Sequence, residues 1–195
     1  MIRIRLPLPQ AQPLFDTICS GINSRQGETM SNNLILFGST LGDTERIARR
    51  LAELLPGETR VASVANFRMA SLRDFDRIIL GTSTWGSGEL QDDWEGALGQ
   101  LSGLDLSGKT VALFGLGDAS AYPETFVDGL GILHEAVAQA GALRIGYWPT
   151  EGYAFEASRA VIGGRFAGLV LDEAGQSHLT GERLTRWAQD LQASA

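Results

Sequence analysis

The chain has 195 residues, of which 44% are hydrophobic and 20% charged, as expected for a globular protein of about one domain. The formal net charge of −7 argues against a nucleic-acid partner, because no basic stripe is left to follow a phosphate backbone. No stretch approaches the roughly 18 consecutive apolar residues of a membrane span. The single cysteine, Cys19, excludes internal disulfides and thiolate metal sites, so we expect a reducing, cytoplasmic setting.

The first 30 residues differ in composition from the rest of the chain. Pro7, Pro9 and Pro13 interrupt every apolar stretch, so this segment predicts neither a stable element nor a secretory signal. We expect residues 1–30 to be a disordered N-terminal extension. Met30 stands directly before the first apolar run and is a candidate for the functional start. Residues 31–195 then form the single folded domain.

Strand and helix patterns alternate from residue 33 onward. Apolar runs predict strands at 34–37, 59–64, 76–81, 110–114 and 143–147. Helical spacing of apolar residues predicts helices over 45–55, 90–101, 126–137 and 184–191, the last capped by Thr180. The polar, glycine-containing stretch 148–165 separates the fifth strand from another apolar run at 166–171, which indicates an excursion inserted into the last strand. Alternating strands and helices predict an open, parallel, doubly wound α/β sheet.

The loop after the first predicted strand, residues 38–44, is rich in glycine and hydroxyl groups. It leads directly into a helix, whose first N–H groups have no intrahelical partner and carry the positive end of the helix dipole. Together with hydroxyl donors, these groups are suited to bind a phosphate. A helix simply capped by Asp43 or Thr44 is the competing interpretation.

Two further loops follow buried strands, and each contains an aromatic residue among Gly, Ser and Thr. These residues are Trp85 and Tyr122. In open parallel sheets ligands bind beyond the carboxyl ends of the strands, where exposed aromatic rings stack on planar groups. A flat cofactor therefore explains both residues, although either ring could instead fold back over the core. Trp94, at helical spacing with Leu90 and Leu98, is expected in the core.

Four segments give the chain a specific resemblance: residues 37–44, 84–91, 113–118 and 152–156. Together they resemble the flavodoxins of the long-chain type. The resemblance implies five parallel strands in the order 2-1-3-4-5, with helices on both faces and the last strand interrupted by the insertion that distinguishes long-chain members. It also implies one non-covalently bound FMN.

The resemblance further implies roles for individual residues. Residues 39–44 hold the FMN phosphate, Trp85 and Tyr122 enclose the isoalloxazine ring, and Gly117 and Asp118 lie near its pyrimidine edge. The peptide at Gly86 turns toward the ring on reduction. The complete implied set is Ser39, Thr40, Leu41, Gly42, Asp43, Thr44, Thr84, Trp85, Gly86, Ser87, Gly88, Gly115, Leu116, Gly117, Asp118 and Tyr122. Leu41 replaces the usual threonine, so one hydroxyl donor is missing, and Asp43 replaces a common lysine or asparagine. The Asp43 charge repels a phosphate but favours the helix N-terminus, so its two effects oppose each other and looser FMN binding is one possible outcome.

Other kinds of site have little support in the sequence. The segment 115–117 opens like a dinucleotide motif, but Ser120 stands where the third glycine belongs. The segment 81–85 fails as a hydrolase elbow at its last position, Trp85. His134 and His178 are expected at the surface or half-buried, and no His or Cys cluster predicts a metal site.

The function implied by the resemblance is that of a low-potential one-electron carrier and not an enzyme. The implied partners are basic redox proteins: an NADPH-dependent flavodoxin or ferredoxin reductase as donor, and an acceptor such as nitrogenase or a radical-enzyme activase. The alternative is an FMN-dependent NAD(P)H:quinone reductase on the same fold. We expect a cytoplasmic monomer without a nucleic-acid or membrane partner.

Overall fold

A parallel β-sheet forms the centre of the protein in a computed structural model that describes residues 32–194. Its strand order is β10 (Leu169–Asp172), β5 (Thr110–Gly117), β3 (Arg77–Trp85), β1 (Asn33–Phe37) and β2 (Thr59–Ser63). Leu34, Ile35 and Leu36 are fully buried, since both faces of the sheet are covered. The predicted doubly wound sheet and its strand order are confirmed. The extension 1–30, with Cys19 and Met30, lies outside the described residues.

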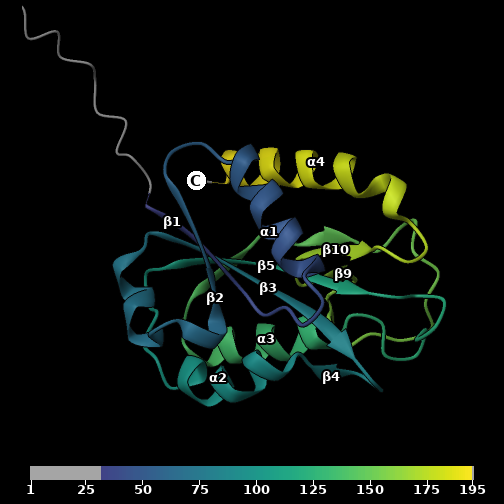
Figure 1. Cartoon of the computed structure of the whole chain (residues 1–195), viewed down its shortest axis with the longest axis horizontal. Helices are drawn as coiled ribbons and strands as arrows, with labels where there is room; N and C mark the ends of the chain where they lie inside the picture. Colours follow the sequence, from purple (N-terminus) through teal and green to yellow (C-terminus); the bar gives the residue numbers. More distant parts are fainter. Residues whose placement is uncertain (1–31, 195) are drawn as a thin grey trace, which may run out of the picture.

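Helices cover the sheet in two layers (Figure 1). On one face lie α1 (Asp43–Leu54) and α4 (Thr180–Ala193), and on the other α2 (Asp92–Ser102) and α3 (Asp128–Gln139). Two short 3-10 helices, η1 (Val64–Asn66) and η2 (Met69–Asp74), connect β2 to β3, and η3 (Ser177–Leu179) precedes α4. None of the helices in the described part of the chain is long and apolar enough to cross a membrane. Trp94 is fully buried, as predicted, and its indole N–H donates to the Gly81 carbonyl at 2.8 Å.

The fifth strand position is occupied by two separate strands, as the sequence predicted. Strand β6 (Leu143–Ile145) pairs with the first half of β5, and β10 pairs with its second half, both in parallel. The chain between them forms a small antiparallel sheet of β7 (Trp148–Pro149), β9 (Arg165–Phe166) and β8 (Val161–Ile162). This segment, residues 146–168, is called the insertion below.

Several local predictions were wrong. Helix α1 has Gly42 as its N-cap and no capping side chain, so neither Asp43 nor Thr44 caps it. Thr180 is the first residue of α4, and its hydroxyl donates to the Glu173 carboxylate. Leu90 belongs to the short strand β4 (Glu89–Leu90), which pairs with the end of β3, and not to α2.

The two histidines differ in burial. His178 is exposed, but His134 is 7% exposed and therefore buried, contrary to expectation. Its Nε2 lies 3.2 Å from the Tyr147 hydroxyl, and burial, followed by the nearby Arg144 charge, lowers the pKa of the imidazole. His134 is thus a packed histidine of α3, with its imidazole against Tyr147.

Candidate functional site

A pocket of about 380 Å³ opens at the carboxyl ends of β1, β3 and β5. Its walls come from the loops that follow these three strands and from the loop after β10. The lining residues are Ser39, Thr40, Leu41, Asp43, Thr44, Ser83, Thr84, Trp85, Gly86, Leu116, Gly117, Asp118, Tyr122, Glu173 and Ala174. Loops far apart in sequence meet here because parallel strands place their carboxyl ends along one edge of the sheet.

The first wall is the loop between β1 and α1. Gly42 has φ 94°, a left-handed conformation that glycine adopts without a Cβ clash, and its N–H donates to the Ser39 hydroxyl at 3.1 Å. The loop is fixed from behind by Gln91, whose amide Nε2 donates to the Thr40 hydroxyl at 3.3 Å. Gln91 is 2% exposed and also caps α2. These hydrogen bonds fix the loop that leads from β1 into α1.

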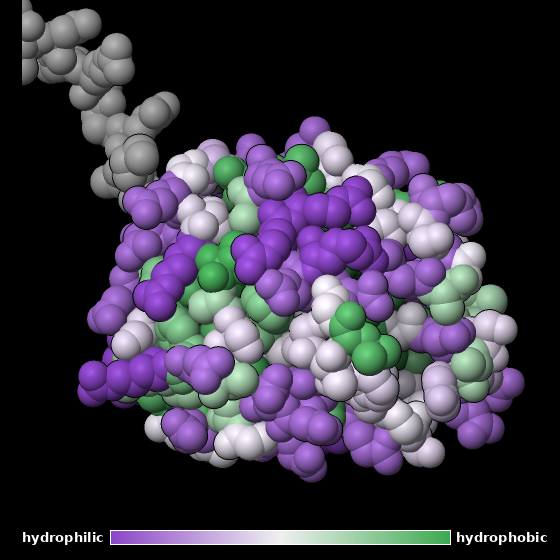
Figure 2. All heavy atoms as spheres, in the orientation of Figure 1, coloured by the Kyte–Doolittle hydropathy of each residue, from purple (hydrophilic) through white to green (hydrophobic). Residues whose placement is uncertain are grey.

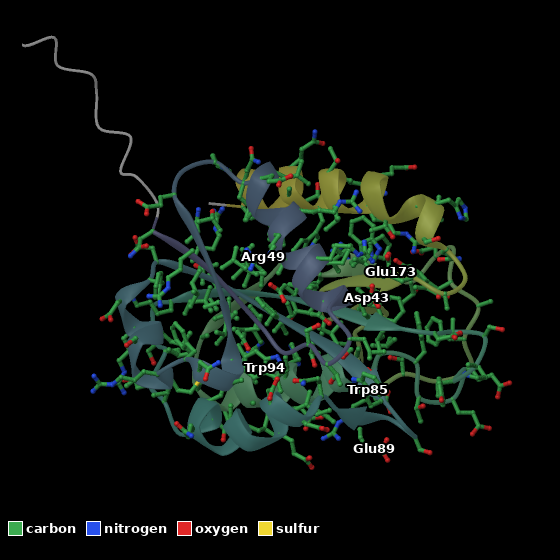
Figure 3. All side chains as sticks on the ribbon, in the orientation of Figure 1. Asp43, Arg49, Trp85, Glu89, Trp94 and Glu173 are labelled. Carbon is green, nitrogen blue, oxygen red and sulfur yellow. The ribbon has the colours of Figure 1, made fainter. Side chains whose placement is uncertain are left out.

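Trp85 and Tyr122 form the aromatic walls. Trp85 is 38% exposed and Tyr122 is 50% exposed, so neither ring folds back into the core. The Trp85 indole N–H donates to the Ser83 hydroxyl at 2.9 Å, which orients the ring at the end of β3 (Figure 3). The Asp118 carboxylate accepts from the N–H groups of Ser120 and Ala121, which shapes the loop that carries Tyr122.

Four of the residues predicted for the site do not line the pocket: Gly42, Ser87, Gly88 and Gly115. Gly115 faces α3 instead, where a Cβ would lie 2.9 Å from the Leu130 side chain. Gly88 has φ 103° and approaches the Asp128 side chain of α3. These two glycines allow close packing of α3, and Gly42 shapes the helix start.

Ser83, Glu173 and Ala174 line the pocket but were not predicted. Ser83 lies next to the predicted Thr84 in the last part of β3, because this strand continues to Trp85, beyond its predicted end at residue 81. Glu173 follows β10, which is adjacent to β5. Its place in the pocket depends on the pairing of distant strands, which the local sequence does not show.

All charged side chains that line the pocket are acidic. Asp43, Asp118 and Glu173 contribute carboxylates, whereas no Lys or Arg occurs among the lining residues. The nearest cation in contact with them is Arg46, whose Nη2 lies 3.0 Å from an oxygen of Asp43 and 2.6 Å from one of Glu173. No group of His, Cys, Asp and Glu within residues 32–194 is arranged to hold a metal ion.

Comparison with known proteins identifies the family of this site. The model of the family described as "Flavodoxin" matches residues 35–187, which include every loop of the pocket. The chain belongs to the flavodoxin family. Two sequenced flavodoxins illustrate the similarity. That of Picosynechococcus sp. is 41% identical over 83% of this chain and 96% of its own length, and that of Helicobacter pylori is 42% identical over 82% and 96%.

Solved flavodoxin structures share the fold. The crystal structure of Fusobacterium nucleatum flavodoxin bound to flavin mononucleotide superimposes with a TM-score of 0.81 and 30% identity, covering 85% of this chain and 99% of that one. Flavodoxins are electron-transfer proteins and not enzymes, so family membership supports the predicted carrier over the quinone reductase alternative. The inserted strands between β6 and β10 agree with the long-chain type of flavodoxin.

Proposed function

We propose that the pocket binds one FMN without a covalent bond and that the protein carries single electrons between redox proteins. The main support is that one pocket combines a hydroxyl-rich helix start with two exposed aromatic rings. These groups fit the two chemically different ends of FMN, a phosphate and a flat ring system. The flavodoxin of Fusobacterium nucleatum, similar over 85% of this chain, was crystallised with this cofactor.

The phosphate end of FMN would be held by the loop between β1 and α1. The hydroxyl groups of Ser39, Thr40 and Thr44 and the free N–H groups of the first turn of α1 would donate to phosphate oxygens. Leu41 is 79% exposed and offers only its backbone N–H, so one hydroxyl donor is missing relative to a loop with threonine there.

The ring end would lie between Trp85 and Tyr122. Stacking on both faces excludes water and leaves no room for a substrate against the ring, which suits electron transfer through the ring edge. The flavin supplies the redox chemistry when bound, and the protein orients it and sets its electrostatic surroundings. Three carboxylates in the lining disfavour additional negative charge, which would lower the potential of the last reduction step.

Titration of flavin-free protein with FMN tests this function. We expect one FMN to bind per chain, with quenching of its fluorescence, and stepwise reduction to show two separate one-electron steps. Without an added reductase, NAD(P)H and a quinone should give no steady turnover. Sustained quinone reduction by the protein alone would instead support the enzymatic alternative.

For the redox partners we propose basic proteins: an NADPH-dependent flavodoxin or ferredoxin reductase, and an acceptor such as nitrogenase or a radical-enzyme activase. The net charge of −7 supports electrostatic steering toward a basic surface. Asp92, Asp93 and Glu95 in the first turn of α2 follow the Trp85 loop. Hydrophilic side chains of both charges cover much of the face shown in Figure 2, so the acidic group on α2 is one part of a polar surface. Association should slow as salt rises, since screening acts within about 8 Å at physiological ionic strength. A rate independent of salt would contradict steering.

The remaining proposals concern the whole chain. Residues 31–195 form the functional domain, and the protein is a cytoplasmic monomer. A chain that begins at Met30 should bind FMN as tightly as the full chain, and sedimentation should give the mass of one chain. Weaker FMN binding by the shorter chain would show that residues 1–29 contribute to the site.

A further inference from the structure

Phosphate binding at this pocket meets an electrostatic obstacle. A phosphate monoester carries a charge of about −1.5 to −2 at pH 7. The lining contains three carboxylates and no cation, and Asp43 is the first residue of the very helix whose start would receive the phosphate. A carboxylate at this position favours the helix dipole but repels a bound anion. A cation close to these carboxylates would offset part of this repulsion.

Arg46 is placed to offset it. Its guanidinium bridges two lining residues from different walls, Asp43 on α1 and Glu173 after β10. The hydrogen bond to Glu173, and then that to Asp43, raises the pKa of Arg46, so its charge is permanent. Glu173 is also held by the Thr180 hydroxyl at the start of α4, and its side chain is only 19% exposed. The bridge is therefore anchored at its Glu173 end.

We propose that Arg46 is a positioning residue of the phosphate end: by pairing with Asp43 and Glu173 it offsets one of their two negative charges and so weakens their repulsion of a phosphate dianion bound beside them. This inference rests on the proposed FMN function and specifies how the pocket distinguishes FMN from a flavin without a phosphate. Arg46 does not line the pocket. It acts through the two carboxylates and not as a phosphate ligand.

Arg49 provides a matched control on the same helix. It is also exposed and also paired with a carboxylate, Glu45, at 2.7 Å, but neither residue lines the pocket. Figure 3 shows Glu173 close to Asp43 at the N-terminus of α1, with Arg49 farther along the helix. Replacing either arginine by glutamine removes the same unit of charge, so a difference between the two variants reports the bridge and not the net charge.

The test compares FMN with riboflavin, which has the same ring and no phosphate. Dissociation constants for flavin-free protein should rise on the order of tenfold for FMN in Arg46→Gln at low salt, and by less than about twofold for riboflavin. The Arg49→Gln variant should bind both flavins within about twofold of the parent. The difference for Arg46→Gln should shrink as salt increases.

A second set of variants separates neutralisation from direct contact. In an Asp43→Asn, Glu173→Gln background, Arg46→Gln should cost clearly less FMN affinity than it does in the parent, because the two carboxylates that hold the half-exposed Arg46 side chain beside the pocket are then absent. Persistent loss of FMN affinity in that background would make Arg46 a direct ligand and overturn the proposal. Equal losses for FMN and riboflavin would show a merely structural role and overturn it too. A parent protein that binds neither flavin would overturn the proposed function itself.

Discussion

Aromatic side chains occur in two regions of this protein and serve opposite purposes in them. At the end of β3 and in the loop after β5, Trp85 and Tyr122 stay 38% and 50% exposed and line a pocket. In the insertion, Phe166 is fully buried, and Tyr153 and Phe155 pack with it against Phe126. Both regions are rich in small and polar residues, so local composition does not distinguish a binding ring from a packing ring.

The difference arises from what surrounds each ring. The insertion rings form a cluster with centroid distances of 5.3 Å from Phe166 to both Tyr153 and Phe155. The Tyr153 hydroxyl donates to the Val170 carbonyl at 2.6 Å and accepts from the Trp148 indole at 2.9 Å, so its polar end is satisfied inside the protein. Trp85 has one such bond, to Ser83, and no ring of the described residues within stacking range.

The largest expected effect is the loss of folding stability in Phe166→Ala, a substitution in the insertion. The substitution removes a fully buried ring from the insertion cluster and should lower the free energy of unfolding by about 3–5 kcal/mol. Urea unfolding of the flavin-free protein measures it. FMN affinity of the folded protein should change little, since Phe166 does not line the pocket. A large loss of FMN affinity with unchanged stability would reverse the roles given to the two regions.

The next largest effect is the contribution of Tyr153 to folding stability, which is lost at high pH. Burial raises the pKa of Tyr153 to about 12 from its ordinary value of 10.0. A raised pKa stabilises the folded state fully below pH 10, and this stability is lost as the pH rises toward 12, by about 2–3 kcal/mol in all. Unfolding measured from pH 8 to 12 should therefore show a steeper decline in the parent than in Tyr153→Phe. Parallel declines would show that Tyr153 is not buried as described.

Trp85 and Tyr122 should instead affect FMN binding more than folding stability. Trp85→Ala and Tyr122→Ala should each weaken FMN binding by about 1–3 kcal/mol, if flavin stacking resembles that of nucleic-acid bases. The stability of the flavin-free protein should change by less than about 0.5 kcal/mol, because both rings are largely exposed. Flavin titration and urea unfolding of the same samples give both numbers. Unchanged FMN affinity in both variants would remove the two residues from the site.

The smallest effect is expected at Gly86. Its φ is 48°, a left-handed conformation that is strained for a β-branched residue. If this peptide turns toward the flavin on reduction, Gly86→Val should lower the first midpoint potential by an amount equivalent to about 1 kcal/mol, one hydrogen bond. Gly108→Val is the control, since Gly108 also has positive φ, 78°, but lies outside the pocket. An unchanged first potential with FMN still bound would show that Gly86 is not the switch.

Features confined to short stretches of chain could be predicted from the sequence. Continuous apolar runs identified the buried strands, and helical spacing placed Trp94 in the core, because these periodicities follow directly from strand and helix geometry. The family resemblance of the segments that follow three strands predicted most of the residues that line the pocket. Helix caps were less predictable: Gly42, and not Asp43 or Thr44, is the N-cap of α1, since the backbone conformation of a turn depends on the packing around it.

Contacts between distant segments could not be determined from the sequence. Glu173 lies in the pocket because β10 pairs with β5, and it meets Arg46 across 127 positions of sequence. Gly115 faces Leu130, and Tyr153 bonds to Val170, only because the helix and the insertion pack on particular strands. Periodicity shows which side chains are buried. The sequence alone left open which distant side chains meet, because that depends on how the strands are ordered and how the helices and the insertion pack against them.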